Sequence, residues 1–174
     1  MEHSENNEIR SIRILLNTAF ILQMVYFAIN LLVSIMPKAF LTYTNSNALN
    51  FEHTMDWPNV ISLVLTTGIF AVLYVIFSHK IKTGSESTGG FGVLLGAGLF
   101  FAFYIIPRVM GIVGNFVMLK KVTSKEITNE TYAAIISLRS ILSFFGVLST
   151  AAVVLLCCAY SMYWFRVKYC LYKK

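Results

Sequence analysis

Two arginines stand inside apolar stretches of this chain, and their positions raise the first question of chemistry. Arg108 follows Pro107 in the segment FFAFYIIPRVMGIVGNFVMLKK, residues 100–121, and Arg139 lies within a later apolar stretch. A guanidinium keeps its charge even in hydrocarbon, so each side chain needs an anion or water beside it. All eight acidic residues lie in the tails or the connections. We therefore expect both arginines to lack a carboxylate partner from the protein, which indicates a site for an external anion or lipid headgroup.

Polar and small residues accompany both arginines at helical spacing. The candidate anion- or lipid-binding residues are Arg108 with Tyr104 and Asn115, and Arg139 with Tyr132 and Ser143. Counted from a turn near residue 123 or 124, each arginine is about 15 residues away, or about 20 Å along a helix. The two are therefore expected at similar depth, as possible neighbours. Pro107 removes one backbone donor, so the carbonyl near Phe103 loses its partner and the helix can kink there.

A simpler interpretation places the two arginines at a membrane boundary. Residues 90–107 are almost long enough to cross a thin bilayer without Arg108, and residues 140–165 are more than long enough without Arg139. Both side chains would then extend to lipid phosphates. The hairpin 109–138 would project from the membrane as an apolar helix pair. Its uncharged residues 109–119 argue against this arrangement, because in water they would need a covering partner. Both interpretations remain open from the sequence.

Residues for catalysis or metal binding are scarce. The three histidines, His3, His53 and His79, lie outside the apolar stretches, so no embedded histidine or carboxylate can act as a general base. The three cysteines form no Cys-x-x-Cys pair, and no ligand spacing typical of a metal site occurs. We therefore predict no catalytic residue, no metal site and no cofactor. An enzyme acting on lipid would have to use a base from a connection, such as Asp56 or His53.

The elements that must position these residues are membrane-spanning helices. Of the 174 residues 57% are apolar and 13% are charged, against about 25% charged in a soluble domain. Four apolar stretches, residues 14–36, 57–78, 90–119 and 132–165, have the roughly 20 residues that a helix needs to cross a bilayer. Lone strands would leave backbone groups unpaired in lipid. The predicted fold is all-α: a single membrane domain, residues 1–174, formed by a bundle of four transmembrane helices.

Helix packing and orientation follow from residue types. Amides and glycines are the expected packing residues, namely Gln23, Asn30, Gly92, Gly96, Gly111 and Gly146. More basic residues lie in the tails and the connection 79–89 than in the other two connections, which places both termini in the cytoplasm. The net charge of +6 flanks apolar stretches, so it is expected to meet lipid phosphates and not nucleic acid.

Three functions fit this pattern. The first is a non-enzymatic protein of the cell membrane that acts through helix–helix contacts as an accessory, regulatory or protective subunit. The second is an oligomeric transporter or pore, selective for anions or lipids, that uses Arg108 and Arg139. The third is an interfacial lipid-modifying enzyme. The expected partners are membrane lipids together with another membrane protein or further copies of the chain, and the small connections favour the first function.

Overall fold

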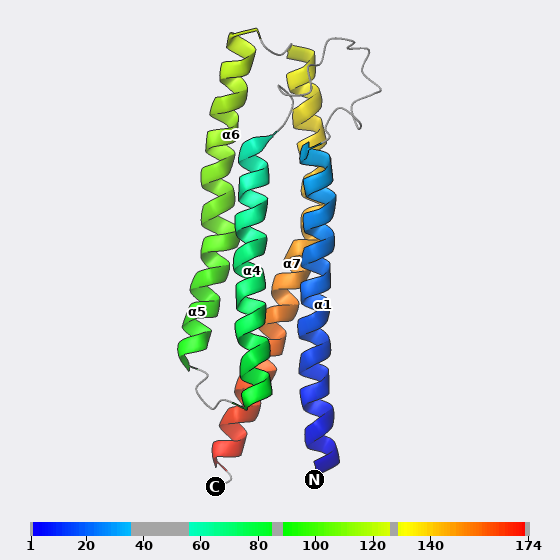
Figure 1. Cartoon of the computed structure of the whole chain (residues 1–174), viewed down its shortest axis with the longest axis vertical. Coiled ribbons are helices and arrows are strands. Elements are labelled where there is room, and N and C mark those ends of the chain that lie inside the picture. The colour runs from blue at the N-terminus through cyan, green and yellow to red at the C-terminus, as the bar shows by residue number, and fades with distance from the viewer. Residues whose placement is uncertain (1, 36–55, 85–88, 126–128, 173–174) are drawn as a thin grey trace.

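The protein is helical throughout the part of the chain that the structure describes. The computed structural model describes residues 2–35, 56–84, 89–125 and 129–172, and within them there is no strand. The elements are α1 (Glu2–Ile35), α4 (Trp57–Thr83), α5 (Gly89–Phe100), the π-helical turn η1 (Phe101–Ile105), α6 (Ile106–Thr123) and α7 (Asn129–Tyr172). The all-α prediction is confirmed. α5, η1 and α6 follow one another without a break and form one long rod (Figure 1).

Within the described ranges, four helical segments are long and apolar enough to cross a membrane. They are Asn7–Ile35, Trp57–Thr83, Gly90–Thr123 and Ile135–Lys168. Each overlaps a predicted stretch, but three of them are longer by four to six residues than the hydropathy alone predicts, for example 57–83 against 57–78. The helices continue into their polar flanks because residues such as lysine, arginine and glutamate are good helix formers outside hydrocarbon.

Both chain termini lie at one end of the molecule, which we call the terminal end (Figure 1). The opposite end, where α6 is followed by α7, is the hairpin end. α1 packs mainly against α7 and α4, and α4 packs in turn against the rod of α5, η1 and α6. α6 and α7 make little contact with each other although they are consecutive helices. The bundle is therefore less tightly closed along the side between α6 and α7.

An aromatic cluster forms the core in the half of the bundle near the terminal end. The Phe77 ring of α4 stacks on Phe91 of α5 at a centroid distance of 5.4 Å, and it meets Tyr160 and Tyr163 of α7 edge-on at 6.0 and 5.7 Å. Gly92 lies directly against the Tyr160 hydroxyl, so a larger residue there would require the Tyr160 side chain to shift. These rings join α4, α5 and α7 mainly through packing, and the Tyr163 hydroxyl also donates to the Lys80 carbonyl of α4 at 3.2 Å.

A buried amide connects three helices in the middle of the bundle. Gln23 of α1 is fully buried. Its Nε2 donates to Thr67 Oγ1 of α4 at 3.2 Å, and its Oε1 accepts from Ser149 Oγ of α7 at 2.8 Å. Both polar ends of the amide are thereby paired, as an apolar environment requires.

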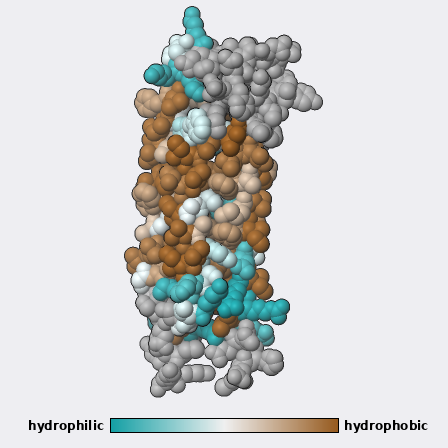
Figure 2. Space-filling model, viewed as in Figure 1, coloured by the Kyte–Doolittle hydropathy of each residue, from teal (hydrophilic) through white to brown (hydrophobic). Residues whose placement is uncertain are grey.

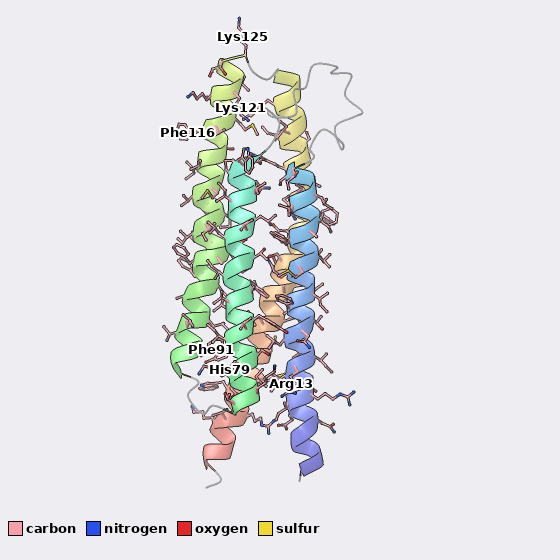
Figure 3. The ribbon with its side chains drawn as sticks, viewed as in Figure 1. Arg13, His79, Phe91, Phe116, Lys121 and Lys125 are labelled. Atoms are coloured by element: carbon pink, nitrogen blue, oxygen red, sulfur yellow. The ribbon has the colours of Figure 1, made fainter. Side chains whose placement is uncertain are left out.

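The outside of the bundle is strongly apolar. Figure 2 shows a hydrophobic band with hydrophilic residues gathered toward its two ends. Large side chains are exposed within this band, and Phe144 on α7 has 78% of its surface free. Figure 3 places Arg13 and His79 toward the terminal end and Lys121 and Lys125 at the hairpin end. This distribution is compatible with a multi-pass membrane protein, because apolar patches of this extent are unusual in water.

Candidate functional site

Arg139 forms an ion pair with Asp56 near the hairpin end. Its Nη2 lies 2.6 Å from Asp56 Oδ2, and its Nε donates to the same oxygen at 2.7 Å. The Asp56 side chain is 8% exposed and that of Arg139 is 30% exposed. The expectation that Arg139 lacks a carboxylate from the protein is therefore wrong. The error arose because Asp56 lies 83 residues away in the chain, in what the sequence presents as a connection.

The start of α4 positions this carboxylate. Asp56 is the N-cap residue, and its Oδ1 accepts the backbone N–H of Asn59 at 3.4 Å. A carboxylate is favoured there because the first N–H groups of a helix are unpaired and carry partial positive charge. Asn59 also donates through Nδ2 to Ser34 Oγ of α1 at 2.7 Å. The local structure at the beginning of α4 thus holds Asp56 between α1 and α7.

The two arginines are not opposite one another. A Cβ added at Gly114 of α6 would lie 3.4 Å from Arg139 Nη2 and 3.6 Å from Pro58 Cβ, and Met118 of α6 packs against Ile135 of α7. This register centres the hairpin about three residues later than the sequence-based count assumed. Arg139 is therefore level with Gly114, and Arg108 lies about 9 Å further along α6 toward the terminal end. The prediction of similar depth is wrong for this reason.

Arg108 is exposed and faces away from the pair. Its guanidinium carbon lies 5.0 Å from the ring centroid of Tyr104, one turn earlier, and that ring stacks on Phe100 at 5.0 Å. Helical side chains tilt toward the N-terminus of their helix, so Arg108 extends toward the middle of the bundle's length. The face of Tyr104 stabilises the cation weakly, and no described carboxylate pairs with it.

A pocket of about 260 Å³ lies beside the Asp56–Arg139 pair, among four helices. It is lined by Tyr26 and Asn30 of α1, Asp56, Asn59 and Ser62 at the start of α4, Pro107, Met110 and Gly111 of α6, and Arg139, Leu142 and Ser143 of α7. The lining combines one acid, one base, two amides and three hydroxyl groups. Its formal charge is zero, so the pocket can bind polar groups of either sign but has no excess charge that would select an anion.

A π-helical turn precedes the α6 wall of the pocket. Pro107 has no N–H for the carbonyl of Phe103, and the N–H of Ile106 donates to the carbonyl of Phe101, five residues earlier. The widened turn η1 is the local response to the proline, where the sequence suggested a kink. Such turns are frequent at functional sites. Here the widened turn lies immediately before the residues that α6 contributes to the pocket.

The remaining candidates for anion or lipid binding lie in different surroundings. Ser143 lines the pocket, and its hydroxyl donates to the Ser140 carbonyl at 2.6 Å. Asn115 is exposed on α6. Tyr132 is partly buried against Met118 and Ile135, near the turn between α6 and α7. Of the predicted set, the structure places only Arg139 and Ser143 in the lining of this pocket.

The predicted packing residues fall into two groups, those in close contact with another helix and those in open positions. Gln23 and Asn30 are buried, and Gly92 is in close contact with Tyr160. A Cβ added at Gly96, Gly111 or Gly146 would meet no atom within 4 Å, so none of the three marks a close helix contact within the chain. Gly98, which the sequence did not single out, lies against Leu73 instead.

Sequence reasoning missed the role of Asp56 and of its neighbours Asn59 and Ser62 in the pocket. The available signal was the segment Asp56-Trp57-Pro58, because aspartate followed by proline within two residues is typical of a helix start. That pattern places a carboxylate at the boundary of an apolar helix, not in a free connection. His53, the other residue considered as a base, lies outside the described residues. The described ranges contain no group of three potential metal ligands.

A role for this protein has to be inferred from the side chains of the pocket and from Arg108. Comparisons with protein-family models, with curated proteins and with solved structures find no match for this chain.

Proposed function

We propose that the chain is a non-enzymatic protein of the cell membrane that acts as an accessory subunit through contacts between transmembrane helices. Its four apolar helices would cross the bilayer with both termini in the cytoplasm, where the basic residues of the terminal end meet anionic lipids. The exposed apolar band supports this placement. The observation that carries the proposal is the position of Arg108.

Arg108 would lie within the hydrocarbon region. Trp57 at one end of α4 and His79 near the other are about 22 residues apart, which corresponds to about 33 Å and matches the roughly 30 Å hydrocarbon core. Gly114 adjoins Pro58 and marks the same boundary on α6. Arg108 would then be about 9 Å inside it, with its side chain directed further inward over Tyr104. A charged group at this depth is costly unless an anion reaches it.

Within residues 2–35, 56–84, 89–125 and 129–172, no carboxylate pairs with Arg108. Asp56 is engaged with Arg139, and the other seven acidic residues belong to the tails, the connections or the first residues of α7. A second copy of the chain would bring another Arg108 to the same face, and the two like charges would repel. The partner that fits is a different membrane protein with an aspartate or glutamate at the corresponding depth of a transmembrane helix.

Site-specific photocrosslinking in the native membrane tests this proposal. A photoreactive amino acid at Ile112, exposed one turn beyond Arg108 on the same face, should capture a transmembrane segment that contains an acidic residue. The adduct should disappear in Arg108→Leu and persist in Arg13→Leu, which removes an exposed arginine outside this face. The same label at Val147 of α7 serves as the positional control.

Two results would reject the accessory-subunit proposal. One is an adduct that persists at full yield in Arg108→Leu. The other is a captured segment without an aspartate or glutamate within about a turn of the crosslink, or about four residues.

A further inference from the structure

The pocket beside Asp56 and Arg139 has a polar floor and an open mouth. Among the described residues, Asn30, Asp56 and Ser62 of α1 and α4 are buried. In contrast, Gly111 of α6 and Ser143 of α7 are exposed. The pocket therefore opens between α6 and α7, toward the apolar exterior of the bundle, and its polar groups lie at the inner end.

Contacts above and below the mouth leave this opening between the two helices. Toward the hairpin end, Gly114 lies against Arg139 and Met118 packs against Ile135. Toward the terminal end, α5 meets α7 at Gly92. Between these contacts Gly111 has no side chain, and an added Cβ there would meet no atom within 4 Å. An elongated molecule can thus enter sideways while its head reaches the polar floor.

The ion pair keeps hydrogen-bonding capacity for a ligand. Nε and Nη2 of Arg139 both bind Oδ2 of Asp56, which leaves Nη1 without a partner among the described residues. From the described part of the chain, Oδ1 of Asp56 accepts one long bond, from the Asn59 N–H at 3.4 Å. Asn30 uses Nδ2 on the Tyr26 carbonyl, so its Oδ1 is a further acceptor. The floor therefore offers one cationic donor together with one anionic and one neutral acceptor.

We infer that this pocket binds a zwitterionic phosphate–ammonium headgroup. The phosphate receives the free Arg139 donor, and the ammonium donates to Asp56 Oδ1 and to Asn30. A net charge of zero in the lining favours a ligand whose own charges cancel, because an anion alone would leave Asp56 facing it across the pocket. The volume of about 260 Å³ is below the roughly 300–1,000 Å³ of sites that enclose a drug-sized molecule. This volume suits the headgroup of a lipid whose acyl chains extend out of the pocket past Met110 and Leu142. This assignment does not depend on a protein partner.

Native mass spectrometry of the full chain in a non-ionic detergent tests the assignment. Phosphatidylethanolamine should remain bound at concentrations about tenfold lower than phosphatidylglycerol with the same acyl chains, a difference of about 1.4 kcal/mol. Soluble glycerophosphoethanolamine, a phosphodiester with the same cancelling charges as the lipid headgroup, is added alone and distinguishes a free zwitterion from a lipid. Retention of either zwitterion in preference to the anionic lipid supports the inference and identifies its source.

Two glycine variants provide a matched comparison. Gly111→Leu places a side chain in the mouth at a position where an added Cβ meets no atom within 4 Å, and it should weaken phosphatidylethanolamine binding about tenfold. Gly96→Leu makes the same change at an equally open position of α5, away from the pocket, and should leave binding unchanged.

Three outcomes would overturn the inference. They are equal retention of phosphatidylethanolamine and phosphatidylglycerol, no binding of either zwitterion, and unaltered binding in Gly111→Leu.

Discussion

In the half of the bundle near the terminal end, Phe77 is enclosed by three aromatic rings from two other helices. In the half near the hairpin end, the corresponding space is a pocket with an ion pair, two amides and an open side. The first half is held mainly by ring packing, with one hydrogen bond from the Tyr163 hydroxyl to the Lys80 carbonyl, whereas the second is held by several directed polar contacts. The difference indicates that stability is concentrated in one half and binding capacity in the other.

The largest effect is expected from removing the centre of the aromatic cluster. Phe77→Ala should lower the free energy of unfolding by about 3–5 kcal/mol, because a fully buried ring leaves a cavity among three partners. Thermal unfolding in detergent, followed by circular dichroism, measures this change. Phe144→Ala is the control, since that ring is largely exposed, and should change stability by no more than about 0.5 kcal/mol. Equal losses in both variants would break the comparison between the two halves.

A smaller effect is expected from breaking the ion pair. Arg139→Gln leaves Asp56 buried without its charged partner and should cost about 2 kcal/mol, less than a fully enclosed pair because Arg139 is 30% exposed. The double variant Asp56→Asn with Arg139→Gln should recover at least about half of the loss, since no isolated charge remains. Unfolding of Arg139→Gln, Asp56→Asn and the double variant under the same conditions gives the coupling energy. A double variant less stable than Arg139→Gln would contradict the assignment of Asp56 as its partner.

Replacing the buried amide of Gln23, which lies between the two halves, should lower the free energy of unfolding by a moderate amount. Gln23→Leu removes hydrogen bonds to Thr67 and Ser149, each worth about 0.6 kcal/mol in a membrane bundle, so the loss should be about 1 kcal/mol. Asn17→Leu removes a single, exposed bond from Tyr74 and should cost less. Chemical denaturation of the detergent-solubilised protein resolves the order. A larger loss in Asn17→Leu would show that burial of the amide is unimportant.

The smallest change separates two glycines that look equivalent in the sequence. Gly92→Ala should destabilise by about 1 kcal/mol, because the new methyl group meets the Tyr160 hydroxyl and the ring must shift. Gly96→Ala has open space and should be neutral or slightly stabilising, by about 0.5 kcal/mol, because alanine favours the helix. The melting temperature of Gly92→Ala should be lower than that of Gly96→Ala. A lower melting temperature for Gly96→Ala would place the close contact at Gly96.

The fold could be predicted well from the sequence, and the site only in part. The four apolar stretches match the four helices able to cross a membrane. Such a helix can be recognised from the length and hydropathy of one continuous segment of the sequence. The apolar residues on both sides of Arg139 in the sequence also predict that it lies in an apolar helix. The ion-pair partner of Arg139 could not be predicted, because Asp56 belongs to a separate element and no local sequence pattern connects the two residues.

The sequence by itself determined that the chain forms helices of these lengths, that Pro107 interrupts the backbone bonding, and that Arg108 lies in an apolar segment. Only the tertiary structure decided that Arg139 meets Asp56, that Gly92 and not Gly96 is in close contact, and that the two arginines face different surroundings. The physical reason is rotation and register. Each residue along a helix turns the side chain by about 100°, so a displacement of about three residues between neighbouring helices changes every contact they share.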